Sequence, residues 1–153
     1  MQLSIDERKK RAIAYFTEGY NCAQSVFLAY SDLFGVDEAL AKKISVPFGG
    51  GMGKMGEVCG AFSASFMLVG LQYGTIDPKD ADKKTKMYAS VQQIGDQFKA
   101  LYGTLACAQL VEKNTYPEDV SLSEASLLSY ADRPCIRFVE RAAEIIGQQL
   151  VSE

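Results

Sequence analysis

The chain has 153 residues, of which 48% are hydrophobic, and its formal net charge is −3. This size and composition predict one globular domain spanning residues 1–153 and exclude a disordered chain. The acidic balance, with no long basic run, argues against nucleic acid as a partner.

The sequence contains no histidine, the most common general base and transition-metal ligand. This excludes a Cys–His catalytic pair, and it excludes a covalently attached haem, whose C-x-x-C-H motif needs histidine. A transition-metal site would have to use thiolates, carboxylates or main-chain groups. Because the charged N-terminus lacks the apolar segment of a signal peptide, we expect a cytoplasmic protein whose cysteines are thiols or ligands rather than structural disulfides.

Helical caps and periods recur along the chain, and no β-type alternation is found. A first helix is predicted to begin after Ser4 and to end at Gly19. Asn21 caps a second helix, and a short third helix is expected between Asp37 and Pro47.

The segment from Val58 to Ile76 carries no charge and approaches the length of a membrane span. It contains glycines, serines and a glutamine, so we interpret it as a buried helix from Glu57 to Tyr73 and expect no membrane contact. The sequence therefore predicts an all-α fold, a compact bundle of five or six helices around this central helix.

Three later helices are predicted from their caps. One begins at Asp77-Pro78 and carries an inner seam that includes Tyr88 and Phe98. Thr104 caps a short helix, and Asp132 caps the last one.

A glycine-dense loop precedes the central helix, with five glycines among residues 49–56. The run from Gly51 to Gly56 matches the G-x-G-x-x-G pattern of dinucleotide-binding loops, but residues 42–48 make a poor strand. We instead expect the loop to lie beside the cysteines, where its backbone amides could hold an anion or tune a cofactor. The glycines assigned to this role are Gly49, Gly50, Gly51, Gly53, Gly56 and Gly60.

Each cysteine closely follows a predicted helix cap. Cys22 comes one residue after its cap, and the other three come three residues after Gly56, Thr104 and Asp132. Free amides and the helix dipole stabilise a thiolate in a first helical turn and lower its pKa. If these helix starts converge, they bring together four reactive thiols: Cys22, Cys59, Cys107 and Cys135.

The chain resembles the redox-active protein family named for its C-GCAxxG-C-C pattern. The resemblance extends from about Tyr15 to Ala143 and rests on NCAQ at 21–24, GEVCGA at 56–61, GTLACAQL at 103–110, and Cys135. Ala64 replaces the last glycine of the motif, a change expected to affect helix contact distance and not the sulfurs. The family is similar to the cluster-bearing part of split-Soret cytochromes, which implies that the cysteines could hold an iron–sulfur cluster or another metal, without haem.

Three functions are compatible with this pattern. In the favoured one, a thiol oxidoreductase, a low-pKa cysteine attacks a disulfide or oxidant and a second cysteine resolves it, with Cys59 chosen as the nucleophile. In the second, the four thiolates hold a metal or an iron–sulfur cluster for electron transfer or sensing. In the third, the chain is a non-enzymatic helical module, such as a homodimer, with cysteines in its core. The redox partner and the substrate stay open.

Overall fold

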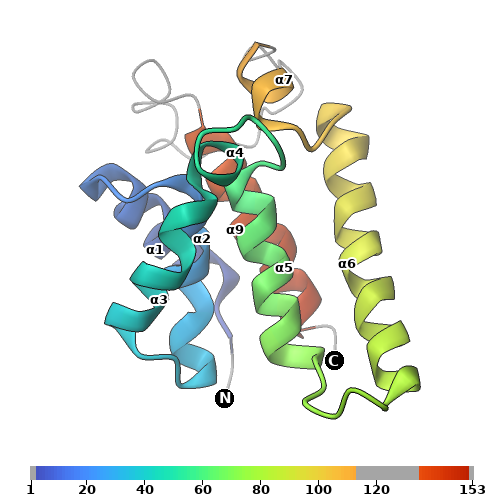
Figure 1. Cartoon of the computed structure of the whole chain (residues 1–153). Coiled ribbons are helices and arrows are strands. Elements are labelled where there is room, and N and C mark those ends of the chain that lie inside the picture. The colour runs from blue at the N-terminus through green and yellow to red at the C-terminus, as the bar shows by residue number, and fades with distance from the viewer. Residues whose placement is uncertain (1–2, 113–134, 152–153) are drawn as a thin grey trace.

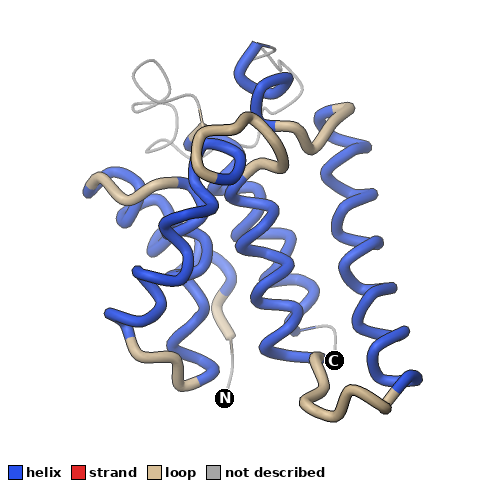
Figure 2. Tube along the Cα trace, viewed as in Figure 1, coloured by secondary structure: helices blue, strands red, loops and turns tan. Residues whose placement is uncertain are grey.

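Helices make up most of what the computed structural model describes, which is residues 3–112 and 135–151. These residues contain no strand, only an isolated bridge between Val58 and Ala106 (Figure 2). The predicted all-α fold is confirmed. The predicted cap at Asp132 lies outside the described residues.

The first three helices begin at the predicted caps. The Ser4 hydroxyl accepts a hydrogen bond from the Glu7 amide and starts α1 (Ile5–Glu18), which ends at Gly19 with a φ of 120°. Asn21 caps α2 (Cys22–Tyr30), and the short 3₁₀ helix Ser31–Phe34 follows. Asp37 caps α3 (Glu38–Ser45).

The later helices begin further along the chain than the sequence predicts. The central helix, α5 (Gly60–Tyr73), starts at Gly60 and not at Glu57. Residues 56–58 instead pair with residues 106–108: the Cys107 amide donates to the Glu57 carbonyl at 2.6 Å, and the Ala108 amide donates to Gly56. This pairing uses backbone groups that a longer helix would need. Helix α7 (Cys107–Glu112) also begins later in the chain than predicted. The Thr104 hydroxyl accepts from the Ala106 amide and does not cap a helix.

Helix α6 (Ala81–Tyr102) is capped by Asp80 rather than Asp77. The Asp77 side chain accepts from the Lys79 amide and closes a local turn. The buried face of α6 is confined to its C-terminal half, and Tyr88, predicted to lie on the inner seam, is 53% exposed. The first turn of α6 extends past the end of α5 (Figure 1), and further along Met87 and Val91 are only partly buried where they pack against the core.

The helix directions place three helix starts at one end of the bundle. Helices α2, α5 and α9 (Ile136–Val151) begin at the end where α4 (Gly49–Met52) and α7 lie, and α3 and α6 run toward it (Figure 1). Helix α1 packs against α2 and α9, and α5 packs against α2, α6 and α9. The positive ends of three helix dipoles therefore point to the same region.

Aromatic side chains join α5, α6 and α9 in the core. Phe62 stacks on Phe98 with ring centroids 3.8 Å apart, and Tyr102 meets Phe138 edge to face at 5.0 Å. All four side chains are at most 2% exposed. The buried Tyr30 hydroxyl ties α2 to α9 by donating to the Ala143 carbonyl at 2.5 Å. These contacts fix the relative positions of the helices that carry the cysteines.

Candidate functional site

All four cysteines lie at helix starts, although three of their offsets differ from the prediction. Cys22 is the first residue of α2, as predicted. Cys59 is the N-cap of α5 and Cys107 the first residue of α7. Cys135 precedes α9, and its carbonyl accepts from the amides of Phe138 and Val139. The cysteines thus occupy the end of the bundle described above.

The thiols of Cys22 and Cys59 interact where α2 packs against α5, and this interaction is the largest cause of the pKa shift of each. Cys22 is 7% exposed and Cys59 is 3% exposed. The main-chain amides of Ala23, Gly50 and Gly60 also lower the pKa of Cys22, whereas one such amide, that of Ala61, acts to lower the pKa of Cys59. The donors therefore favour a negative charge on Cys22.

The two thiols differ in pKa for this reason. The Cys59 hydrogen bond and the three amides lower the pKa of Cys22 from 9.0 to about 6, against the effect of burial. The pKa of Cys59 is raised well above 9.0, first by its hydrogen bond to Cys22, then by burial and by the charge of Cys22. The two shifts together favour a negative charge on Cys22 and a retained proton on Cys59.

The glycine loop folds mainly upon itself. The amide of Gly53 donates to the Pro47 carbonyl at 2.7 Å, and those of Lys54 and Gly56 donate to Gly49 and Gly50 at 3.2 Å. Amides in the G-x-G-x-x-G run are thus occupied, and a 3₁₀ helix, not a strand, precedes the loop. This arrangement does not resemble a dinucleotide-binding loop, which requires a preceding strand and amides directed at phosphate.

Gly51 in the loop and Gly60 at the start of α5 allow the backbone to approach the cysteines closely. A Cβ atom added to Gly60 would lie 2.7 Å from the Cys22 sulfur and 2.8 Å from the Phe48 carbonyl oxygen. One added to Gly51, whose φ is 68°, would lie 2.5 Å from the Cys107 Cβ. Of the glycines predicted to lie at the site, Gly50, Gly51 and Gly60 meet cysteines, whereas Gly49 packs on Asn21 and Gly53 and Gly56 close the loop.

Cys107 and Cys135 interact electrostatically with the pair. Burial raises the pKa of Cys107, and the charge of Cys22 raises it further. In the same way, Cys135 contributes to the raised pKa of Cys59. Both outer cysteines are half-buried and so more accessible than the inner pair.

The donors do not fit a four-thiolate metal centre. Among residues 3–112 and 135–151, no three Cys, Asp or Glu side chains form a group that could hold a metal ion. Structural zinc and iron–sulfur sites need about four thiolates around one centre, and this site offers a contacting pair with two further sulfurs outside it. The function proposed below uses no metal.

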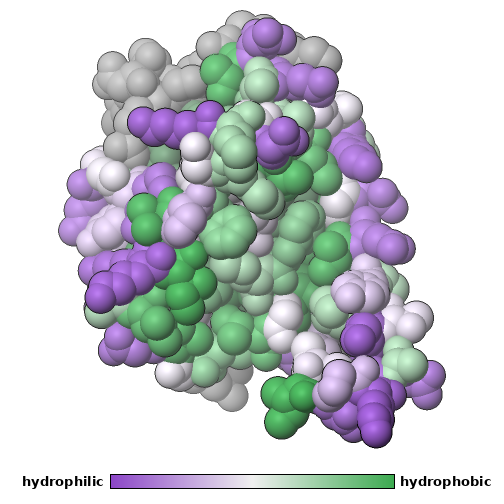
Figure 3. Space-filling view, in the orientation of Figure 1, coloured by the Kyte–Doolittle hydropathy of each residue, from purple (hydrophilic) through white to green (hydrophobic). Residues whose placement is uncertain are grey.

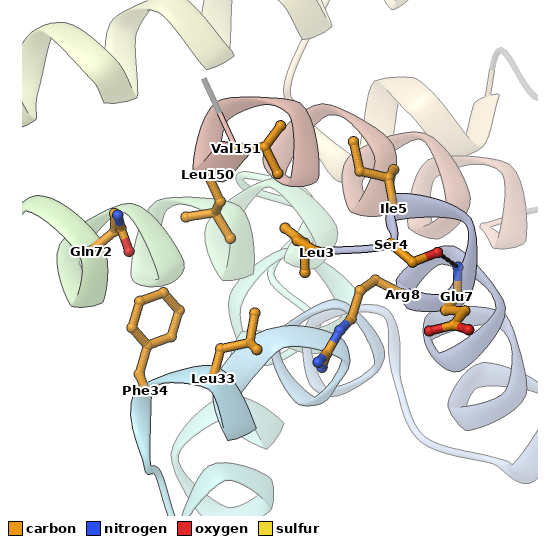
Figure 4. Close-up of a pocket in the computed structure, with 10 residues that line it drawn as sticks. All are labelled: Leu3, Ser4, Ile5, Glu7, Arg8, Leu33, Phe34, Gln72, Leu150 and Val151. Carbon is orange, nitrogen blue, oxygen red and sulfur yellow. Dashed lines mark hydrogen bonds between the residues drawn. The ribbon is translucent and has the colours of Figure 1, made fainter. Parts of the chain in front are cut away.

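A hollow of about 630 Å³ lies at the opposite end of the bundle (Figure 4). Among the lining residues that the structure describes, Arg8 is the one lysine or arginine, and its guanidinium donates to the Asp32 carboxylate at 2.6 Å and to the Ala29 carbonyl at 3.0 Å. Because no cysteine lines this hollow, it does not extend the thiol site. Its lining residues are Leu3, Ser4, Ile5, Glu7, Arg8, Leu33, Phe34, Gln72, Leu150 and Val151.

Several main-chain groups at the site, and a second role of Asn21, were not predicted from the sequence. The Asn21 side chain accepts from the Gln24 amide at 2.9 Å and donates to the Val46 carbonyl at 2.9 Å. It thus caps the helix of Cys22 and fastens the segment that leads into the glycine loop. The Leu105 carbonyl accepts from the Cys59 amide at 2.8 Å. The capping box of Asn21 was the only signal in the sequence for these contacts.

The fold and the site together define an all-α protein with a buried, hydrogen-bonded thiol pair. A family model described as "Putative redox-active protein (C_GCAxxG_C_C)" matches residues 20–149, and the chain belongs to this family. The resemblance stated from the sequence is thereby confirmed. Searches of curated proteins and of solved structures found no match. None of the described helices has the length and apolarity required to span a membrane.

Proposed function

We propose that this member of a redox-active family is a thiol–disulfide oxidoreductase whose reacting pair is Cys22 and Cys59. The observation that supports this is the pair of buried thiols brought together where α2 packs against α5, an arrangement that lowers the pKa of Cys22 and raises that of Cys59. A thiolate is the attacking species in disulfide exchange, and a pKa near the ambient pH suits that role. Free thiols also favour a reducing compartment such as the cytoplasm.

Cys22, and not Cys59, is assigned as the nucleophile. The choice of Cys59 from the sequence assumed that the glycine loop would supply its amides and access to that sulfur. In the structure Gly50 and Gly60 donate to Cys22, which is also the more exposed of the two. Cys59 keeps its proton, and its thiol lies in contact with that of Cys22, as a resolving thiol must.

The proposed reaction has two exchange steps. The Cys22 thiolate attacks one sulfur of a substrate disulfide, the substrate S–S bond breaks, and the first substrate thiolate leaves. Cys59 then passes its proton to that thiolate and attacks the Cys22 sulfur, which forms the Cys22–Cys59 disulfide and releases the second substrate thiolate. The substrate gains two electrons and the one proton that the pair held, and the second substrate thiolate takes its proton from water. A dithiol redox partner would return the pair to its reduced form.

A Cys59→Ser variant should trap the intermediate. With glutathione disulfide as the probe, we expect a stable mixed disulfide on Cys22, because serine cannot resolve it, while the matched variant Cys107→Ser proceeds to the internal disulfide. Intact-mass analysis followed by peptide mapping measures both. If glutathione attaches mainly to Cys107 or Cys135, or if all four thiols stay unmodified, the assignment fails, and the second result would favour the helical module with structural cysteines.

A further inference from the structure

A shallow hollow of about 360 Å³ lies beside the thiol pair, between the glycine loop and α5. Five of its six lining side chains are apolar, and all five are half-buried. The face that carries α4 and α5 is widely apolar, with charged side chains around it (Figure 3). The hollow is lined by Phe48, Met52, Val58, Ser63, Phe66 and Met67.

Chain connections and contacts place the hollow next to the reacting sulfurs. Val58 directly precedes Cys59, and the Ser63 amide donates to the Cys59 carbonyl at 3.0 Å. On the other wall, the Phe48 carbonyl adjoins Gly60, against which the Cys22 sulfur also packs. One wall of the hollow thus belongs to the segment that carries Cys59, and the other wall packs against Gly60, which the Cys22 sulfur also contacts.

The lining indicates the chemistry of the occupant. Methionine and phenylalanine side chains form an adaptable, polarisable surface suited to an aromatic or aliphatic group. Ser63 is 6% exposed, and its hydroxyl has no hydrogen-bond partner among the described residues. On the same helix the Ser65 hydroxyl donates to the Ala61 carbonyl at 3.0 Å. An unsatisfied buried hydroxyl is costly, and a polar group of a ligand would satisfy it.

The apolar surface also extends beyond the hollow. Leu40, Ile44 and Val46 precede Phe48 in the chain and are 44–50% exposed. An occupant that continues past the hollow, such as a polypeptide, would cover them, whereas a small disulfide would not.

We propose that this hollow binds the apolar side chain next to the cystine of a peptide or protein disulfide, and so selects the substrate of Cys22. This proposal rests on the proposed thiol–disulfide function. The side chain enters between Phe48 and Met67, and a backbone carbonyl of the substrate accepts from Ser63. The substrate sulfur is then held beside Cys22.

Binding can be tested without any redox step. In protein labelled with ¹³C at the methionine methyls, N-acetyl-phenylalanine amide should shift the signals of Met52 and Met67. Those of Met55, on the exposed loop, and Met87, on α6, are internal controls and should stay in place. If neither Met52 nor Met67 shifts at millimolar probe, the proposal is overturned. It is equally overturned if these signals move on dilution of the protein alone, since the face would then be an interface between copies.

Substrate selection is tested with two disulfides of equal charge, the symmetrical disulfides of N-acetyl-Phe-Cys-amide and N-acetyl-Ser-Cys-amide. We expect the phenylalanine disulfide to oxidise the pair at least about tenfold faster, a ratio that burial of one aromatic side chain supports. Met67→Gln should reduce this ratio toward one, and Met55→Gln should not change it. If the two disulfides oxidise the unsubstituted protein at equal rates, the proposed substrate selection is overturned. If the methyl shifts occur and neither disulfide reacts, the oxidoreductase function itself fails.

Discussion

Alanine in place of Gly60 should disrupt the contact between α2 and α5 and with it the thiol pair. The new methyl would lie 2.7 Å from the Cys22 sulfur and 2.8 Å from the Phe48 carbonyl oxygen, so one of these groups must move. Overpacking of this kind costs about 1–3 kcal/mol. We expect the melting temperature to fall by roughly 3–10 °C in calorimetry. The pKa of Cys22 should also rise, because the Gly60 amide and Cys59 shift away from its sulfur.

Gly70→Ala provides a control on the same helix. No atom lies within 4 Å of a Cβ added at Gly70, and its φ is not positive. Helix propensity alone should therefore stabilise this variant by about 0.5–1 kcal/mol, with the Cys22 pKa unchanged. Equal effects of the two substitutions would contradict the close packing proposed at Gly60.

Loss of Cys59 should move the titration of Cys22 toward that of an ordinary thiol. In the reduced protein about half of Cys22 is thiolate at pH 6, since its pKa is about 6. Cys59→Ala removes the largest cause of that low pKa and leaves burial opposed only by three amides. We expect the alkylation rate of Cys22 by iodoacetamide at pH 6 to fall, and the midpoint of the thiolate absorbance near 240 nm to rise.

Cys59→Ser is the matched variant, because a hydroxyl can still donate to the Cys22 sulfur. Its Cys22 pKa should lie between those of the unsubstituted protein and Cys59→Ala. If the alanine and serine variants titrate like the unsubstituted protein, the hydrogen bond between the thiols is not the cause of the low pKa.

The same pair should make stability depend on pH. Between about pH 6 and 9, the unfolded chain binds a proton on Cys22 that the folded protein does not, so the free energy of unfolding rises with pH. Above pH 9 the unfolded chain loses the Cys59 proton that the folded protein keeps, so stability falls again. Denaturant unfolding of the reduced protein at several pH values measures this stability maximum. Cys22→Ser should abolish the rise in the free energy of unfolding between about pH 6 and 9.

Local signals in the sequence were sufficient for much of the fold. Ser4, Asn21 and Asp37 each form the predicted cap because a side-chain oxygen meets an amide three residues ahead. Gly19 and Gly103 end their helices for an equally local reason, their positive φ. Such features require no knowledge of distant residues.

Helix starts that depend on distant pairing were not predictable in this way. Cys59 is an N-cap because residues 56–58 pair with residues 106–108, far along the chain, before α5 can begin. The sequence therefore suggested that the cysteines lie at helix starts but placed Cys59 three residues inside the helix. Which thiols touch, and which of them receives the loop amides, depends on the crossing of α2 and α5.

The most direct measurement is the identity of the disulfide that forms when the reduced protein meets one equivalent of glutathione disulfide. Denaturation in an alkylating reagent, followed by peptide mapping, identifies the paired cysteines. We predict a single bond between Cys22 and Cys59, with Cys107 and Cys135 alkylated. A bond that includes Cys107 or Cys135, or a protein with all four cysteines alkylated, would contradict the assignment of the reacting pair.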